Sequence, residues 1–361
     1  MTMRPESNKK LHRGNAAAFP WLSARYLVSG VFFFALAGCS VQGQVTPPLP
    51  SLDIDAARVT VSGLSSGAYM AQQLHLAHSD RVAGAALLAG GPYGCAQGDL
   101  RIALAQCMAP DDAALPALAP LADSVRERAA DGRLAPLSGL AGDKVWVYHG
   151  QLDSTVGAGV SQAAADLYAA LDAGVEVTTR FDLPFAHLMP TAAPGDDCTR
   201  AEAPFIARCA FDAAGEAFSL LYGVDAPGQA SGELRVFDQR PYADDPGNPP
   251  GADSGYLYVP QACAEGASCG LHIALHGCEQ SAEKIGDLFA REAGFNRWAD
   301  AANVVVLYPQ ARPSLRPLNP KGCWDWWGYT GTDYDTRDGA QMRWIARMSA
   351  ALGAPLGRAD S

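Results

Sequence analysis

The pentapeptide Gly63-Leu64-Ser65-Ser66-Gly67 matches the G-x-S-x-G pattern of a nucleophile elbow. In an elbow, small flanking residues let the serine occupy a strained turn between a strand and a helix, where its hydroxyl is exposed. Here residues 58–62 have the composition of a strand, and residues 68–77 have the apolar spacing of a helix. The context predicts a catalytic nucleophile at Ser65 rather than a glycine-rich turn of a nucleotide-binding type of fold.

A serine hydroxyl becomes a good nucleophile when an imidazole accepts its proton and a carboxylate orients that imidazole. In enzymes with this elbow the acid and then the histidine follow the serine along the chain. Asp153 comes directly after a buried strand and is the expected acid, with Asp182 as a less favoured alternative. His187 comes after the next strand and is the expected base. The alternative role for His149 is to support the loop that carries the acid.

The turn at His276, Gly277 and Cys278 follows another apolar strand, at residues 271–275, and precedes a helical segment. A His-Gly turn at this position supplies one N–H of an oxyanion hole, and the residue after the nucleophile supplies the other. We therefore expect Cys278 and Ser66 to donate these two hydrogen bonds, the alternative being a turn without chemistry. The resulting acyl-transfer mechanism requires no metal ion and no organic cofactor.

Three of the seven tryptophans, Trp324, Trp326 and Trp327, lie within four residues of one another. Prolines precede this segment and glycines follow it, which favours a loop. So dense an aromatic loop either fills part of the core or offers a surface to an apolar ligand. The flanking residues favour the second interpretation, which makes these tryptophans candidate substrate-binding residues.

Strands that are apolar throughout alternate with helical segments along the chain. This alternation predicts an α/β protein with a mainly parallel sheet that helices cover on both faces. The expected strands are residues 58–62, 82–88, 144–149, 176–181, 271–275 and 304–308, with an antiparallel pair at 232–237 and 255–259. A division into two domains near residue 230 would leave two thin sheets, so one sheet built from both halves is the better interpretation.

The N-terminus has the pattern of an export signal. Five basic residues among the first 25 precede an apolar run at 26–37 that is short for a membrane span. The run ends in Leu36-Ala37-Gly38-Cys39, which resembles a lipobox, where a signal is cleaved and Cys39 is acylated. The alternative is an ordinary signal peptide that ends near a cysteine. We expect an exported protein, either secreted or held at the outer-membrane or periplasmic side by a lipid on Cys39.

The remaining chain divides by composition. After the signal at residues 1–38, residues 39–55 are rich in proline and are expected to be a tether. A single catalytic domain is expected at 56–353, followed by a short tail at 354–361. The net charge of the whole chain is −11, and loss of the basic signal would make it more acidic. An acidic surface argues against nucleic acid and against anionic substrates.

Eight cysteines remain after Cys39, an even number in a chain that carries an export signal. Eight cysteines allow many connectivities, but three pairs are close in sequence and leave one pair over. No Cys-x-x-Cys spacing occurs, so a zinc site is not expected. The expected disulfides are Cys95–Cys107, Cys198–Cys209, Cys263–Cys269 and Cys278–Cys323.

Together these motifs resemble the poly(3-hydroxybutyrate) depolymerases whose catalytic domain is a circularly permuted α/β-hydrolase. The resemblance covers nearly the whole chain after residue 55. It implies a Ser/Asp/His triad, an oxyanion hole that includes Cys278, and tryptophans that bind a polyester chain. The residues that carry it are Gly63-Leu64-Ser65-Ser66-Gly67-Ala68-Tyr69-Met70, His149-Gly150-Gln151-Leu152-Asp153, Phe185-Ala186-His187, Leu275-His276-Gly277-Cys278 and Cys323-Trp324-Asp325-Trp326-Trp327-Gly328.

The order of the segments also indicates permutation. In an unpermuted hydrolase the opening antiparallel strands and the oxyanion strand precede the elbow, whereas here they lie at 232–308, after His187. A helix expected at 339–352 would then pack where the helix that leads into the elbow strand normally runs. Secreted depolymerases of this kind often carry a separate polymer-binding domain, and no such segment follows residue 353. Soluble oligomers are therefore considered as substrates beside the polymer.

Two other functions fit parts of this pattern. A feruloyl or acetylxylan esterase would use the same fold and the same His-Gly oxyanion turn. A surface lipoprotein that binds a ligand without catalysis would keep the pocket and the lipid anchor. The complete order of serine, acid and histidine favours an esterase over the non-catalytic alternative.

Overall fold

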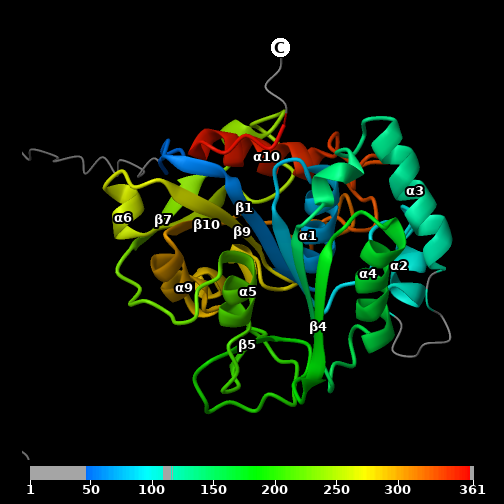
Figure 1. Cartoon of the computed structure of the whole chain (residues 1–361), viewed down its shortest axis with the longest axis horizontal. Helices are drawn as coiled ribbons and strands as arrows, with labels where there is room; N and C mark the ends of the chain where they lie inside the picture. Colours follow the sequence, from blue (N-terminus) through cyan, green and yellow to red (C-terminus); the bar gives the residue numbers. More distant parts are fainter. Residues whose placement is uncertain (1–45, 109–114, 116, 358–361) are drawn as a thin grey trace, which may run out of the picture. The chain divides into compact units, whose positions relative to one another are not determined.

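A mixed sheet of eight strands forms the centre of the protein, in the order β4-β3-β2-β1-β9-β10-β8-β7 (Figure 1). The computed structural model describes residues 46–108, 115 and 117–357, so the expected export signal and Cys39 lie outside the described residues. The strands of the sheet are β1 (Ile54–Leu64), β2 (Gly84–Leu88), β3 (Lys144–Gly150), β4 (Glu176–Leu183), β7 (Glu233–Asp238), β8 (Ser254–Val259), β9 (Cys269–Leu275) and β10 (Val304–Tyr308). A second sheet pairs β5 (Met189–Thr191) with β6 (Ile206–Arg208).

The strand directions match the expectation of a mainly parallel sheet. The six strands from β4 to β10 are parallel neighbours, and β8 and β7 run antiparallel at one edge. Gly63 of β1 lies opposite Leu87 of β2 on one side and opposite Leu275 of β9 on the other. The carboxyl ends of these three strands therefore meet at one edge of the sheet, which is where open parallel sheets bind ligands.

Helices cover both faces of the sheet (Figure 1). They are α1 (Ser66–Ala77), α2 (Leu100–Gln106), α3 (Leu118–Ala130), α4 (Ala158–Leu171), α5 (Ala213–Tyr222), α6 (Gln261–Ala264), α7 (Ala282–Ile285), α8 (Leu288–Glu292), α9 (Phe295–Ala302) and α10 (Ala340–Leu352), with short 3₁₀ helices at Leu137–Leu140 and Arg240–Tyr242. Side chains of α1, α3, α4 and α10 join one hydrophobic cluster, and those of α5, α8 and α9 join another. Within the described residues, no helix combines the length and the apolar character that crossing a bilayer requires.

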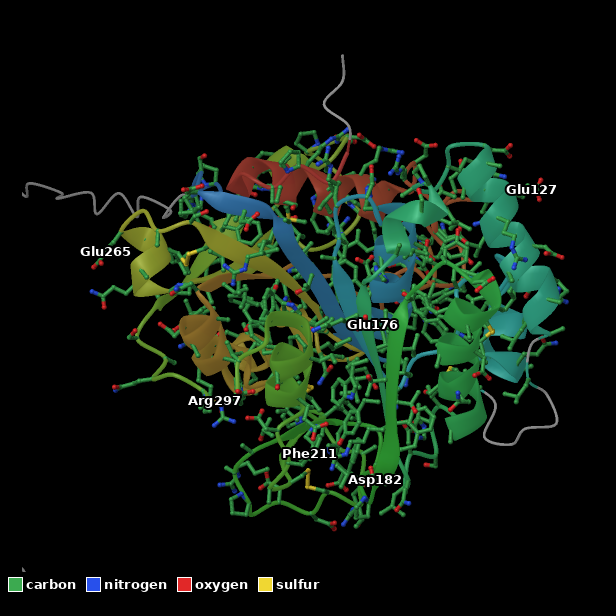
Figure 2. All side chains as sticks on the ribbon, in the orientation of Figure 1. Glu127, Glu176, Asp182, Phe211, Glu265 and Arg297 are labelled. Carbon is green, nitrogen blue, oxygen red and sulfur yellow. A yellow bond between two sulfur atoms is a disulfide. The ribbon has the colours of Figure 1, made fainter. Side chains whose placement is uncertain are left out.

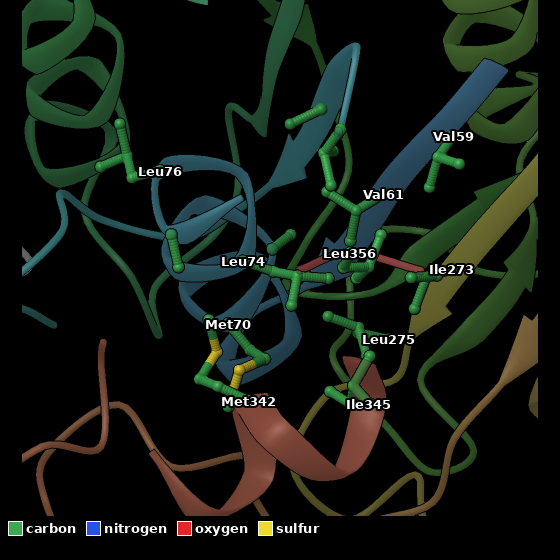
Figure 3. Close-up of a cluster of buried hydrophobic side chains, with 14 of the residues drawn as sticks. Val59, Val61, Met70, Leu74, Leu76, Ile273, Leu275, Met342, Ile345 and Leu356 are labelled. Carbon is green, nitrogen blue, oxygen red and sulfur yellow. The ribbon is translucent and has the colours of Figure 1, made fainter. Parts of the chain in front are cut away.

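The two clusters arise from the alternation of side chains along each strand. In β10, Val305 and Leu307 face one cluster, whereas Val304 and Val306 face the other. Because both faces are covered by helices, both sets are apolar, which explains why the strands lack a polar face. Figure 3 shows part of the first cluster, to which α1 contributes Met70 and Leu74, β9 contributes Leu275 and α10 contributes Met342.

Two boundaries differ from the sequence prediction. The expected tether at 39–55 includes residues that belong to the domain, because Leu49 is buried and its N–H donates to the Tyr242 hydroxyl at 2.8 Å. The expected tail at 354–361 also begins inside the domain. Leu356 is buried, and its carbonyl lies 2.8 Å from Nδ1 of His78. Composition missed both segments because their contacts are made with distant parts of the chain.

All four expected disulfides are present, at Cys95–Cys107, Cys198–Cys209, Cys263–Cys269 and Cys278–Cys323. Three of them close short loops, and the fourth joins the end of β9 to the loop that precedes α10. A disulfide stabilises the folded protein mainly by restricting the unfolded chain. The fourth bridge therefore also fixes two segments that are distant in sequence.

His272 lies in the middle of β9 and is fully buried. Its two ring nitrogens each lie 2.7 Å from a hydroxyl of β1, those of Thr60 and Ser62. Burial removes the imidazole from water and lowers its pKa to about 3. The folded protein therefore holds this ring neutral at pH values where the unfolded chain would protonate it.

We predict that His272 weakens the protein as pH falls. Because the folded pKa lies below the unfolded value near 6.5, the unfolded chain binds the extra proton, and stability is lost between those two values. The loss from this one group is about 1.4 kcal/mol per pH unit. Urea unfolding at pH 6.5 and pH 5 should show a shallower pH slope for His272→Gln than for the wild-type protein. Equal slopes would contradict the assignment of a buried neutral ring.

Candidate active site

Ser65 occupies the sharp turn between β1 and α1, as the elbow motif predicts. Its backbone has φ of 58° and ψ of −120°, a conformation that costs a residue with a side chain ~1–3 kcal/mol. The Ser65 N–H donates to the carbonyl of Leu88 at 2.8 Å, which attaches the turn to the end of β2. The side chain is partly exposed and lines a pocket.

Both glycines of the motif are required by close contacts of the backbone. A Cβ atom on Gly63 would lie 2.1 Å from the carbonyl carbon of Gly67. A Cβ atom on Gly67 would lie 2.3 Å from the carbonyl oxygen of Leu275, at the end of β9. Neither contact can accommodate a side chain, so the two glycines allow the elbow to fold tightly and to approach the loop after β9.

Asp153 and His187 form a close pair after β3 and β4. Nδ1 of His187 lies 2.6 Å from Oδ2 of Asp153. The other carboxylate oxygen, Oδ1, accepts hydrogen bonds from the N–H groups of Thr155 at 2.8 Å and Val156 at 3.0 Å. Because a carboxylate only accepts, Nδ1 carries the proton in this pair, and Nε2 is left as the basic nitrogen.

The carboxylate of Asp153 stays ionised although it is buried. Burial alone would raise its pKa, but the hydrogen bond and charge of His187 and the N–H groups of Val156 and Thr155 outweigh burial and lower it. The ionised form is the one that can orient an imidazole and stabilise its protonated state.

The alternatives to this pair have other roles in the structure. Asp182 is exposed near the end of β4 (Figure 2) and accepts a hydrogen bond from Arg180, whereas His187 pairs with Asp153. His149 is buried, and its Nε2 lies 2.8 Å from the carbonyl of Val156. It therefore supports the loop that carries the acid, which was the alternative role expected for it.

A pocket of about 460 Å³ contains Ser65 and His187 in its lining. Cys278 also lines it, so residues that follow β1, β4 and β9 meet in one cavity. Most of the remaining wall is apolar, and apart from the two tryptophans of the aromatic loop it comes from segments without a recognisable motif. These wall residues include Leu100, Leu104, Met108, Phe205, Leu318, Trp326 and Trp327.

The N–H groups of Ser66 and Cys278 are free to serve a ligand. Among the hydrogen bonds of the described residues, neither group donates to a protein acceptor. Glu279, the next residue, donates its own N–H to the carbonyl of Lys321 at 2.7 Å, and the Cys278–Cys323 disulfide holds the same loop. Two unpaired N–H groups near a hydroxyl are the arrangement that an oxyanion hole requires.

Asp325 folds the aromatic loop around its own carboxylate. Oδ1 accepts from the N–H groups of Trp327, Gly328 and Tyr329, and Oδ2 accepts from the N–H and the hydroxyl of Thr330. Burial raises the pKa of Asp325, and these hydrogen bonds oppose the rise. The loop is thus held by one fully buried acidic side chain.

The three tryptophans of this loop do not share one role. Trp326 and Trp327 line the pocket, and Trp326 stacks on Tyr69 with the ring centroids 4.4 Å apart. Trp324 is fully buried in the core beside His276 and does not line the pocket. The expectation that Trp324 binds substrate is therefore corrected, because its side chain packs in the core and does not reach the pocket.

Two proteins of known sequence are similar to this chain over most of its length. No protein-family model matches it. A poly(3-hydroxybutyrate) depolymerase of Delftia acidovorans is 38% identical over 322 residues, covering 87% of this chain and 63% of the relative. The chain thus spans less than two thirds of that relative's length. A polyhydroxybutyrate depolymerase of Talaromyces funiculosus is 36% identical over 313 residues, covering 81% of this chain and 89% of the relative.

Solved structures agree with these relatives. A serine-to-alanine variant of a PHB depolymerase, complexed with R3HB trimer, superposes with a TM-score of 0.76 at 33% identity. That match covers 84% of this chain and 98% of the other chain. The crystal structure of PHB depolymerase from Penicillium funiculosum superposes with a TM-score of 0.75 at 33% identity and covers 84% and 99%, respectively. The likeness covers most of this chain and nearly the whole of each solved chain.

We predict that Asp325→Asn destabilises the protein by about 2–5 kcal/mol, because an amide N–H₂ would face N–H and O–H donors in a buried site. Asp333→Asn, an exposed position in the same loop, is the matched control and should change stability by less than about 0.5 kcal/mol. Urea unfolding measures both values. Equal stability of the two variants would show that the Asp325 carboxylate does not hold the loop.

Proposed function

The chain belongs to the poly(3-hydroxybutyrate) depolymerase family, and on this premise we propose that it is a serine esterase that hydrolyses poly(3-hydroxybutyrate) or its oligomers. The observation that carries this proposal is the 2.6 Å pair of His187 and Asp153, whose histidine lines the same pocket as Ser65. An oriented imidazole that lines the same pocket as a partly exposed hydroxyl supplies the groups that acyl transfer needs.

In this proposal Ser65 attacks the ester carbonyl while Nε2 of His187 accepts the hydroxyl proton. Asp153 stays ionised, because its pKa is lowered, and stabilises the imidazolium that forms. His187 then gives its proton to the leaving alcohol, which leaves an acyl group on Ser65. A water molecule activated by the same imidazole hydrolyses that ester and restores the serine.

The N–H groups of Ser66 and Cys278 supply the oxyanion hole in this mechanism. Both lack a protein acceptor among the hydrogen bonds of the described residues, and both lie next to residues of the pocket wall. Such N–H donors stabilise the negative charge on the carbonyl oxygen in the transition state more than they stabilise the neutral ester.

The pocket wall suits a neutral, weakly polar polyester. Trp326, Trp327, Leu104 and Phe205 supply apolar surface, which matches the methyl-bearing backbone of a hydroxybutyrate chain. A relative of the same family has been solved with R3HB trimer, which supports an oligoester of this class as the ligand here. The acidic net charge of −11 disfavours anionic substrates instead.

We also propose that the strand order, the domain boundaries and the export of this chain follow the pattern of the family. The sheet is interpreted as a circularly permuted α/β-hydrolase sheet, because β7 to β10 follow the elbow strand in the chain yet complete the same sheet. A single catalytic domain then begins before β1 and ends after α10. The four disulfides support export to an oxidising compartment. The signal and the lipid at Cys39 stay predictions of the sequence.

We predict that Ser65→Ala lowers kcat for hydroxybutyrate trimer and for a small p-nitrophenyl ester by about 10³-fold or more. The thermal midpoint should stay unchanged, because the hydroxyl makes no packing contact that the fold needs. Wild-type enzyme should cleave the trimer faster than feruloylated or acetylated sugars. Activity of the variant within tenfold of the wild type, or a preference for the sugar esters, would overturn the assignment.

We predict that Trp327→Ala raises KM for hydroxybutyrate oligomers while sparing the small p-nitrophenyl ester, because a binding wall acts on long substrates. Trp324→Ala is the matched core variant and should cost ~3–5 kcal/mol of stability. Its activity toward both substrates should fall together above its lowered thermal midpoint. If Trp327→Ala affects both substrates equally, its role is structural, and the polyester wall must lie elsewhere.

A further inference from the structure

His276 is a fully buried histidine at the edge of the sheet where the candidate catalytic residues lie. It follows the last residue of β9 and lies two positions before Cys278. Its ring contacts Trp324, with the centroids 5.4 Å apart, and Phe289, with the centroids 6.2 Å apart. Packing against these two rings therefore fixes the orientation of the imidazole, which has no contact with solvent.

The two ring nitrogens of His276 meet two different backbone groups. Nδ1 lies 2.7 Å from the carbonyl oxygen of Gly277, and Nε2 lies 3.1 Å from the N–H of Ala311. A carbonyl oxygen only accepts and an amide N–H only donates. The contacts therefore define one tautomer, in which Nδ1 carries the proton and Nε2 accepts.

The ring is neutral under ordinary conditions. Burial lowers the pKa of His276 to about 4, although the hydrogen bond to Gly277 opposes this change. A protonated ring would also place an N–H against the N–H of Ala311. His276 therefore takes no part in proton transfer at neutral pH, and its role is that of a fixed donor.

The carbonyl that His276 holds belongs to the same peptide unit as the Cys278 N–H. The Gly277–Cys278 peptide is trans, so its C=O and its N–H point in opposite directions within one plane. A donor that fixes the carbonyl on the inner side thereby directs the N–H to the opposite side, where Cys278 lines the pocket. Glycine at 277 places little restraint of its own on this peptide.

A second buried side chain restrains the preceding peptide. Oε1 of Gln280 accepts from the N–H of Gly277 at 2.7 Å. Its Nε2 donates to the carbonyls of Pro204 and Phe205, at 3.1 Å and 3.0 Å. Gly277 is thus held on both sides, by Gln280 at its N–H and by His276 at its carbonyl, which also accepts a longer bond of 3.3 Å from the backbone N–H of Gln280.

We propose that His276 is a positioning residue of the oxyanion hole, whose Nδ1–H bond to the Gly277 carbonyl aims the Cys278 N–H at the oxyanion. This inference rests on the proposed esterase function. Loss of the Nδ1–H bond leaves the Gly277 carbonyl with only the longer 3.3 Å bond from the Gln280 N–H. The Gly277–Cys278 peptide is then less firmly oriented, which misdirects one oxyanion donor while leaving the binding wall intact. The effect therefore falls on kcat and leaves KM nearly unchanged.

Two substitutions separate the two bonds of the ring. In His276→Asn the side-chain amide N–H₂ can occupy the place of Nδ1 and donate to Gly277, while the acceptor for Ala311 is lost. In His276→Gln the amide reaches the place of Nε2 and can accept from Ala311, while the donor to Gly277 is lost. Each variant loses one buried hydrogen bond, so their losses of stability should be similar.

The expected result, with a small p-nitrophenyl ester and hydroxybutyrate trimer, is a kcat about 10- to 100-fold lower for His276→Gln at unchanged KM. His276→Asn should retain kcat within about threefold of the wild type. His272→Gln is the matched control, since it also alters a fully buried neutral histidine next to β1 and should reduce stability without lowering kcat. All activities are measured well below the thermal midpoint of each variant.

Equal kcat values for the two His276 variants would overturn the inference and leave the esterase assignment in place. Wild-type protein that hydrolyses no ester would overturn both. Nitrogen-15 NMR of the histidine rings in the unmutated protein provides a test that does not depend on folding of the variants. A protonated Nδ1 and an unprotonated Nε2 at pH 7 support the inference, and the opposite tautomer contradicts it.

Discussion

The parallel pairing of β1 with β9 is the constraint on which the site depends. It places Gly63 opposite Leu275, so that the elbow after β1 and the loop after β9 leave the sheet side by side. The two loops approach so closely that Gly67 has no room for a side chain against the Leu275 carbonyl. The proposed nucleophile and the proposed oxyanion donor at Cys278 are therefore brought together by backbone geometry, although they are far apart in sequence.

The other parts of the site are added to this frame. Strands β3 and β4 extend the same parallel sheet and place Asp153 and His187 in the loops at the same edge. The loops beyond the strand ends are then held by three further contacts. These contacts are the Cys278–Cys323 disulfide, the hydrogen bonds of the Asp325 carboxylate and the bond from His276 to Gly277. Because the sheet determines which loops are neighbours, the order of its strands along the chain is free to vary, and the permuted order that we propose can build the same site.

Much of this arrangement could be predicted because it follows from local patterns. The apolar strands, the elbow at Ser65 and the loops of Asp153 and His187 each have a signal within a few residues, and parallel strand order determines which loops meet. The disulfides were predictable because three pairs close short loops and leave one. The pairing of Asp153 with His187, and its preference over Asp182, followed from position in the strand order.

What could not be predicted depends on contacts between distant segments. The density of tryptophans at 324–327 does not reveal that Trp324 turns into the core while its neighbours line the pocket. Helix α2 and the loop at Phe205 form pocket wall without any motif, and Leu49 packs on the domain from a proline-rich segment that was expected to be a tether.

The central claim is tested most directly by a crystal structure of the protein after reaction with a fluorophosphonate. The account predicts phosphorus bonded to Oγ of Ser65, with the phosphonyl oxygen ~2.7–3.1 Å from the N–H nitrogens of both Ser66 and Cys278. An adduct on another residue, or a phosphonyl oxygen directed away from both N–H groups, would contradict it.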